Sequence, residues 1–218
     1  METRSVFTGV QSTARDTNKV LRNTYLLLSM TLGFSALVAG TTAMLALPAP
    51  HWAVFLIGAY GLMFLTEKNR NNSMGLVFTF LFTGFMGYTL GPIINLFMSN
   101  GGGDIVLTAI GGTALTFFAL SAYALTTKRD LSFIGGMLFV GFWVLLVATI
   151  ANIFLQMSAL HMALSAMFML FSSGAILLTT QQIVRGGETN YISATITLYI
   201  SIYNIFVSLL SLLGGNRN

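Results

Sequence analysis

The chain is short of charge, cysteine and proline. Its 218 residues include 10 Lys or Arg, 6 Asp or Glu, 3 Pro and no Cys. So few charged side chains cannot solvate the surface of a soluble domain, and without cysteine neither a disulfide nor a thiolate-bound metal forms. Apolar residues, in contrast, are abundant: 55% of the chain is hydrophobic and the mean hydropathy is +0.81. This composition indicates an integral membrane protein.

Seven apolar segments predict the fold. A helix needs about 20 apolar residues to cross the hydrocarbon core, and a charged residue at mid-bilayer costs roughly 2.5–3.5 kcal/mol. No Asp, Glu, Lys or Arg interrupts these segments, and they lack the period-two alternation of β-barrel strands. We therefore predict an all-α integral membrane fold with seven transmembrane helices, of which the second is the shortest: Tyr25–Leu47, Trp52–Thr66, Met74–Phe97, Ile105–Thr126, Leu131–Leu155, Leu160–Thr180 and Tyr191–Leu213.

The basic residues lie on one side of these segments. Nine of the ten precede the first segment or follow the second, fourth and sixth, and only Arg217 breaks the pattern. The positive-inside rule then predicts a cytoplasmic N-terminus and a C-terminus outside. The net charge of +4 reflects this topology and the anionic headgroups of the lipid bilayer, and needs no nucleic acid partner.

The chain divides into a tail and one domain. Residues 1–23 are polar and lack helical periodicity, so we expect a flexible, disordered cytoplasmic tail. A cleaved signal peptide is the competing interpretation, but the apolar run that follows is longer than the 7–15 residues or so of a signal sequence. Residues 24–215 form a single seven-helix transmembrane domain.

The last segment is the most polar, although it is uncharged. Its Ser, Thr and Asn side chains recur at steps of three or four residues and so share one helical stripe. Such a stripe suits close helix packing, with cross-helix hydrogen bonds of about 0.6 kcal/mol each, or the lining of a hydrated path. Both interpretations place this helix inside the bundle. The stripe consists of Ser193, Thr197, Ser201, Asn204, Ser208 and Ser211.

Small residues and a proline characterise the third segment. Gly87 and Gly91 form a GxxxG pair, which lets two helices approach closely. Pro92 removes a backbone N–H directly after Gly91, and this predicts a kink in the outer third of the helix. Ser29 and Gly33 form a similar pair of small residues in the first segment.

Motifs that carry chemistry are missing. His51 and His161 are far apart in the sequence, at the predicted outer boundary, and we interpret them as interfacial residues and not as metal ligands. The sequence has no nucleophile motif, phosphate-binding loop or dinucleotide fingerprint. We therefore expect no enzymatic activity, no cofactor and no metal site.

At four places the sequence resembles a known family. Tyr123–Phe133 (YALTTKRDLSF) and Leu198–Phe206 (LYISIYNIF) resemble the Bax inhibitor (TMBIM) superfamily. With Gly84–Pro92 and Gly186–Tyr191, the chain is most similar to the proteobacterial branch, the inner-membrane modulators of the FtsH protease. The resemblance covers about residues 18–215. It implies six helices around a central seventh, a location in the bacterial inner membrane, and binding to FtsH that restrains its degradation of membrane proteins.

One departure from the superfamily bears on function. Calcium-leak members carry an aspartate in an Asp-Thr-Gln motif on the sixth helix and another in a Leu-Tyr-x-Asp motif on the seventh. The matching positions here are Thr179 and Ser201, and hydroxyls do not titrate near neutral pH. Two hypotheses stay open. The chain is a non-enzymatic regulator of the protease, which the missing carboxylates favour, or a Ca²⁺ or H⁺ leak channel.

Overall fold

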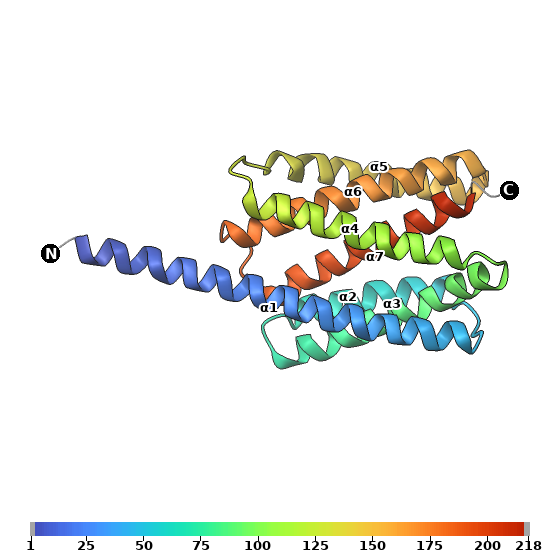
Figure 1. Cartoon of the computed structure of the whole chain (residues 1–218), viewed down its shortest axis with the longest axis horizontal. Coiled ribbons are helices and arrows are strands. Elements are labelled where there is room, and N and C mark those ends of the chain that lie inside the picture. The colour runs from blue at the N-terminus through green and yellow to red at the C-terminus, as the bar shows by residue number, and fades with distance from the viewer. Residues whose placement is uncertain (1–2, 216–218) are drawn as a thin grey trace.

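The computed structural model describes residues 3–215, with side chains from residue 16 onward. Over this range the chain forms seven helices and no strand, and the helices run side by side along one long axis (Figure 1). The predicted segments and the observed helices agree within a few residues at nearly every end. The helices are α1 (Thr3–Met44), α2 (Trp52–Lys68), α3 (Ser73–Ser99), α4 (Gly103–Thr126), α5 (Phe133–Leu155), α6 (Ser158–Val184) and α7 (Tyr191–Gly215).

Six of these helices are long and apolar enough to cross a membrane. The exception is α2, which has 17 residues but still packs along α3 as its antiparallel neighbour. The first predicted segment ends three residues early, at Met44, because Ala46 adopts a left-handed turn with φ of 48° and Pro48 follows. Proline disfavours helix at the residue before it, so the chain turns there.

The structure of the N-terminal tail differs from the disorder that we expected. We predicted that residues 1–23 are disordered, but from Thr3 onward the backbone belongs to α1, a single helix of 42 residues. Extending an existing helix fixes one residue per added hydrogen bond, whereas starting one fixes several, so the apolar span provides the nucleus for a polar extension. Figure 1 shows this part of α1 projecting beyond the rest of the bundle. Its flexibility relative to the bundle and its cytoplasmic location stay predictions.

The last helix lies at the centre. α7 packs against α1, α2, α3, α4 and α6, and its buried side chains belong to both apolar core clusters. α5 packs against α6 and, among the described residues, against no other helix. Of the six helices expected around α7, five therefore contact it, while α5 lies outside against α6.

Close packing of α1 on α3 explains the GxxxG pair. A side chain at Gly87 would collide with the Ser35 carbonyl oxygen, and one at Gly91 would collide with Thr42. The predicted tight packing at these glycines is confirmed. At Gly33, in contrast, an added side chain would meet open space, so no neighbouring helix packs closely against this glycine. α3 continues as a helix through Pro92, and the kink there stays a prediction.

Candidate functional site

Two tyrosines of α7, the buried Tyr199 and the half-buried Tyr203, hold the centre of the bundle together. The hydroxyl of Tyr199 lies 2.6 Å from the hydroxyl of Ser35 on α1 and 3.2 Å from the carbonyl oxygen of Thr83 on α3. Tyr203 lies one turn further along, with its hydroxyl 3.0 Å from that of Thr89 on α3. Lipid hydrocarbon could not form a hydrogen bond with either phenol hydroxyl. Inside the bundle each hydroxyl instead finds a partner on another helix. These contacts tie α7 to α1 and α3.

The predicted polar stripe of α7 is not uniformly buried. Ser193, Ser201 and Ser208 are buried, but Thr197 is exposed. In the middle of the stripe the hydroxyls turn back on their own helix: Thr197 donates to the Ser193 carbonyl at 3.0 Å and Ser201 to the Thr197 carbonyl at 2.8 Å. The hydrogen bonds described for these two hydroxyls therefore stay within α7, and the choice between a packing surface and a hydrated path stays open. The remaining members, Asn204 and Ser211, are half-buried.

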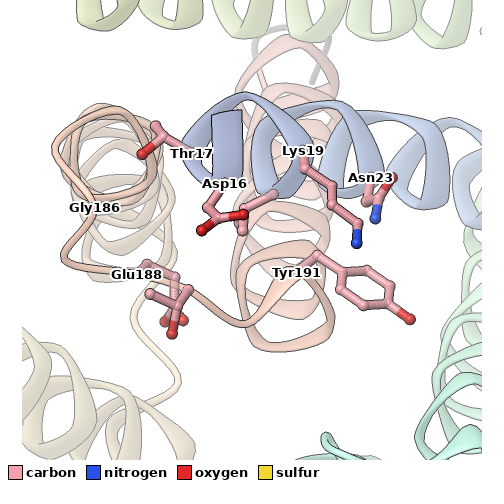
Figure 2. A pocket seen from close by; sticks show the side chains of 9 residues that line it. Asp16, Thr17, Lys19, Asn23, Gly186, Glu188 and Tyr191 are labelled. Carbon is pink, nitrogen blue, oxygen red and sulfur yellow. The ribbon is translucent and has the colours of Figure 1, made fainter. Parts of the chain in front are cut away.

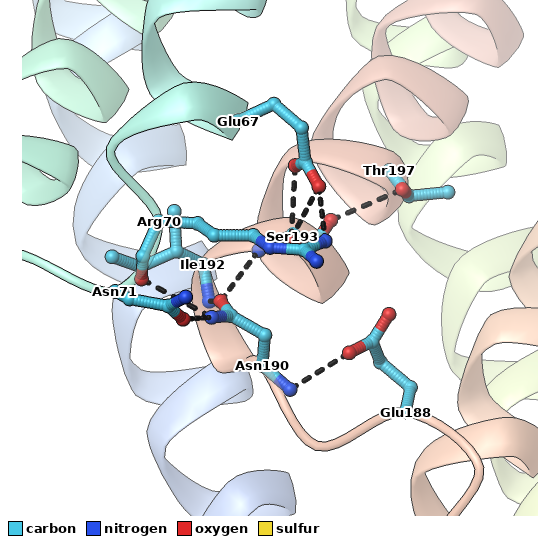
Figure 3. Close-up of polar contacts among 8 residues, drawn as sticks. All are labelled: Glu67, Arg70, Asn71, Glu188, Asn190, Ile192, Ser193 and Thr197. Carbon is cyan, nitrogen blue, oxygen red and sulfur yellow. Dashed lines mark hydrogen bonds and ion pairs between the residues drawn. The ribbon is translucent and has the colours of Figure 1, made fainter.

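Cross-helix contacts do occur at the two ends of the stripe. Ser193 donates to the Glu67 carboxylate of α2, with oxygen–oxygen distances of 2.9 and 3.1 Å (Figure 3). At the opposite end, the Ser211 hydroxyl lies 3.0 Å from the Ser165 hydroxyl and 3.1 Å from Nε2 of His161. The stripe thus joins α7 to α2 at one end and to α6 at the other.

The two positions that match the family acid pair lie on neighbouring helices. Thr179 of α6 and Ser201 of α7 are both buried, and α6 packs closely on α7. Next to Thr179, the fully buried hydroxyl of Thr180 has no hydrogen-bonding partner. This region offers neutral hydroxyl groups. That Thr179 and Ser201 face one another stays a prediction.

Most described charges gather at one end of the bundle, which we call the basic end. It comprises α1 up to Asn23 and the loops 69–72, 127–132 and 185–190, and Figure 1 shows the three loops on the side where α1 projects. Asn190 caps α7 there, because its Oδ1 accepts from the backbone N–H groups of Ile192 and Ser193. Its amide nitrogen also donates to the Arg70 carbonyl at 3.1 Å. The cap thereby fastens the start of α7 to the loop after α2.

Charged side chains reinforce this cap. Glu67 forms an ion pair with Arg70, and Asn190 donates its backbone N–H to Glu188 at 2.7 Å (Figure 3). The ion pair is about half exposed, so its own contribution to stability is small. Its effect is to orient the carboxylate that Ser193 contacts.

A second polar cluster holds the loop between α4 and α5. Gln181 of α6 is buried; it donates to the Arg129 carbonyl and accepts from the Leu131 N–H, both at 2.7 Å. Asp130 in this loop accepts hydrogen bonds from the hydroxyl and N–H of Ser132 and pairs with Arg185 at 3.2 Å. These hydrogen bonds first, and the guanidinium second, lower the pKa of the Asp130 carboxyl.

A cleft of about 570 Å³ opens at the basic end, between α1 and the loop after α6. Figure 2 shows Asp16 of α1 pointing toward the loop that carries Glu188, and Lys19 extending toward Tyr191. Both signs of charge line the cleft, which suits a polar polypeptide segment better than an apolar ligand. Its lining residues are Asp16, Thr17, Lys19, Val20, Asn23, Gly186, Glu188, Thr189 and Tyr191.

The histidines lie apart at the end opposite the basic end. His51 precedes α2 and accepts the Ala53 N–H at 3.4 Å, while His161 contacts Ser211. Within residues 16–215, no three His, Cys, Asp or Glu side chains converge as a metal site would require.

Comparison with known proteins identifies the family. Residues 17–218 match the family described as inhibitor of apoptosis-promoting Bax1. The chain belongs to the Bax inhibitor family. It is 60% identical to "Modulator of FtsH protease YccA" of Escherichia coli K12 and to "Inner membrane protein YccA" of E. coli O6:H1, over 91% of this chain and 90% of each relative. An "Uncharacterized membrane protein" of Vibrio cholerae is 46% identical over 98% of this chain and 97% of the relative.

This Bax inhibitor family protein is a multi-pass protein of the bacterial inner membrane. The names of its relatives and its six long apolar helices agree on that location. The sequence drew attention to the last helix and its family motif, but it did not indicate Gln181 or the tyrosine contacts. In the sequence, the only signal for Tyr199 is a phenol in a segment predicted to be buried, where its hydroxyl requires a partner.

Proposed function

We propose that this protein is a non-enzymatic regulator that binds FtsH in the inner membrane and restrains its degradation of membrane proteins. The observation that carries the proposal is the 60% identity, over nine-tenths of both chains, to a protein named as a modulator of that protease.

The basic end supports this function as a docking surface. Under the predicted topology, α1 up to Asn23, the cleft and the three charged loops all lie on the cytoplasmic side. Hydrogen bonds from Asn190 and Gln181 hold two of these loops in place. A pre-organised polar surface loses less entropy on binding than a mobile one.

Co-purification tests the proposal directly. The tagged protein, extracted in a mild detergent, should retain FtsH, and its overproduction should lengthen the half-life of a membrane substrate of FtsH. A matched pair of variants localises the contact: Asp16→Asn with Lys19→Gln alters the cleft, while Trp143→Ala alters the outer face of α5. The cleft variant should retain less FtsH. No co-purification by the unaltered protein, together with unchanged substrate half-life, would refute the function.

Reporter fusions test the orientation on which this placement depends. A reporter fused after Asn218 should be active only outside the cytoplasm, and one inserted within residues 1–20 only inside. A cytoplasmic C-terminus would mean that one helix does not span, and the short α2 is then the first suspect.

Ion flux distinguishes the leak-channel alternative. Family membership fits that alternative, but Thr179 and Ser201 are hydroxyls where the leak-type relatives hold carboxylates. The purified protein in liposomes should therefore show little pH-dependent Ca²⁺ flux. Thr179→Asp with Ser201→Asp should introduce a titration, because two close carboxyls in a poorly solvated site share a proton. Robust pH-gated flux through the unaltered protein would favour the channel.

A further inference from the structure

The first helix connects the basic end mechanically with the membrane interior. α1 runs without a break from Thr3 to Met44, so no loop separates the projecting part from the span. Tension applied to the N-terminal end therefore acts directly on the part of α1 that lies inside the bundle. An ATP-driven protease that extracts the chain from this end must first release α1 from its neighbours.

α1 is held firmly at its middle. The Ser35 hydroxyl is hydrogen-bonded to Tyr199 of α7, and the Ser35 carbonyl lies against Gly87 of α3 without space for a methyl group. Tyr199 also donates to the Thr83 carbonyl of α3. All three side chains are less than 5% exposed. Moving α1 along its axis would leave buried hydroxyls unpaired and drive Ser35 into a helix with no room for it.

The end of α1 opposite the basic end has further contacts. Asn95 of α3 donates its side-chain amide to the Ala43 carbonyl at 2.8 Å, and Tyr88 donates its hydroxyl to the Pro48 carbonyl just after the helix at 2.9 Å. Gly91 packs against Thr42. These contacts again come from α3, so α1 and α3 form one tightly joined pair.

Nearer the basic end, α1 is held mainly by apolar packing. Leu28 is buried in the core there, whereas Ser29 and Met30 are exposed. The hydrogen bond described at this end joins the Thr195 hydroxyl to the Thr24 carbonyl at 3.3 Å. Among the described hydrogen bonds between α1 and the other helices, the shortest is the one between Ser35 and Tyr199, at 2.6 Å.

We infer that the Ser35–Tyr199–Thr83 contact is an extraction lock, which sets how slowly the protease removes this chain from the membrane by way of α1. The inference rests on the proposed function and adds a mechanism to it. If the chain binds the protease but is extracted from the membrane slowly, the protease stays occupied. The degradation of other substrates is then delayed. Tyr199 is a positioning residue in this device, because it acts by holding α1 in place.

Two substitutions separate the lock from general stability. Tyr199→Phe removes the hydroxyl and keeps the ring. Leu145→Ala instead removes a buried contact of α5, a helix that has no contact with the described residues of α1. Tyr199→Phe should shorten the half-life of the protein about threefold in cells that contain FtsH, a factor that corresponds to one interhelical hydrogen bond of roughly 0.6 kcal/mol in a membrane. Leu145→Ala should lower the melting temperature more, yet leave the half-life unchanged.

The strength of the contact can also be measured without the protease, by pulling single molecules in bicelles from the N-terminus and comparing these variants with Ser35→Ala. The force of the first rupture should fall for Tyr199→Phe, fall equally for Ser35→Ala, and stay unchanged for Leu145→Ala. If rupture force and half-life instead follow the melting temperature across the three variants, the lock is refuted. If the rupture forces behave as expected but the half-lives do not change when FtsH is depleted, the contact holds α1 in place without governing extraction by the protease, and the extraction lock is refuted. The proposed function is decided separately by co-purification with FtsH, so the two failures are distinguishable.

Discussion

α3 and α5 are similar helices in very different surroundings. They have 27 and 23 residues, yet in the described part of the chain α3 packs against α1, α2, α4 and α7 while α5 packs only against α6. Nine residues of α3 are buried but only Leu145 of α5. Among the six candidate spans, α3 is the least hydrophobic and α5 the most.

This contrast reverses the rule that applies to soluble proteins. In water, the most apolar helix is the most buried, but in a bilayer the lipid is as apolar as leucine and gives no drive to bury more leucine. Glycines and hydroxyl residues are instead found in the interior. Glycines permit close contact between helices, and hydroxyl groups form hydrogen bonds there. The following predictions test this difference between α3 and α5.

The largest effect should come from adding one methyl group. Gly87→Ala places a Cβ against the Ser35 carbonyl oxygen, so we expect a loss of about 3 kcal/mol of stability. Gly136→Ala on α5 meets open space and should instead stabilise by about 0.5–1 kcal/mol, since alanine is the better helix former. Thermal unfolding in detergent measures both. Equal effects at the two glycines would contradict the contrast.

A smaller loss should follow when the attachment of α5 is weakened. Gln181→Ala removes both hydrogen bonds to the loop before α5 and leaves the buried Leu131 N–H unpaired. We expect a cost of about 2 kcal/mol. The adjacent Gln182 is exposed, so Gln182→Ala is the matched control and should be neutral. Chemical denaturation of both variants checks this, and equal stabilities would show that the loop does not depend on Gln181.

Acid should weaken the same loop slightly. The pKa of Asp130 is lowered below its ordinary value of 3.8 by Ser132 and Arg185. A lowered pKa in the folded state contributes stability that is complete above about pH 5 and disappears as the pH falls through the lowered value. The unaltered protein should thus lose slightly more stability than Asp130→Asn between pH 5 and pH 3. If the stability of the two proteins falls equally between pH 5 and pH 3, the Asp130 carboxylate does not contribute to the acid sensitivity.

The smallest effect should come from the outer face of α5. Val147 is 65% exposed, and we expect this face to contact lipid, in which alanine is nearly as well accommodated. We expect Val147→Ala to change stability by less than about 0.5 kcal/mol. A loss several times larger would indicate that this face has a protein partner in the membrane.

Sequence reasoning recovered the seven helices because charge exclusion acts on each apolar segment separately. The ends of α4 at Thr126 and of α5 at Leu155 were predicted to the residue. The helical tail was missed because residues 3–23 lack periodicity and owe their helix to the span that follows. The stripe on α7 was predicted as one surface, but its burial depends on which neighbours cover each residue, so Thr197 is exposed and Ser201 buried. Pairs such as Gln181 with Leu131 depend on three-dimensional proximity, which one sequence does not encode locally.

The shortness of α2 has a consequence for the surrounding bilayer. At 1.5 Å per residue its 17 residues span about 26 Å, whereas a typical hydrocarbon core is about 30 Å thick. If α2 spans the bilayer as predicted, with Trp52 at one end and Lys68 at the other, both residue types that favour the interface, it favours a locally thinner hydrocarbon core. Such hydrophobic mismatch costs fractions of a kcal/mol per ångström. The protein therefore fits a thin membrane better on its α2 side than on its α5 side, and lipid thickness becomes a variable that influences where in the membrane it resides.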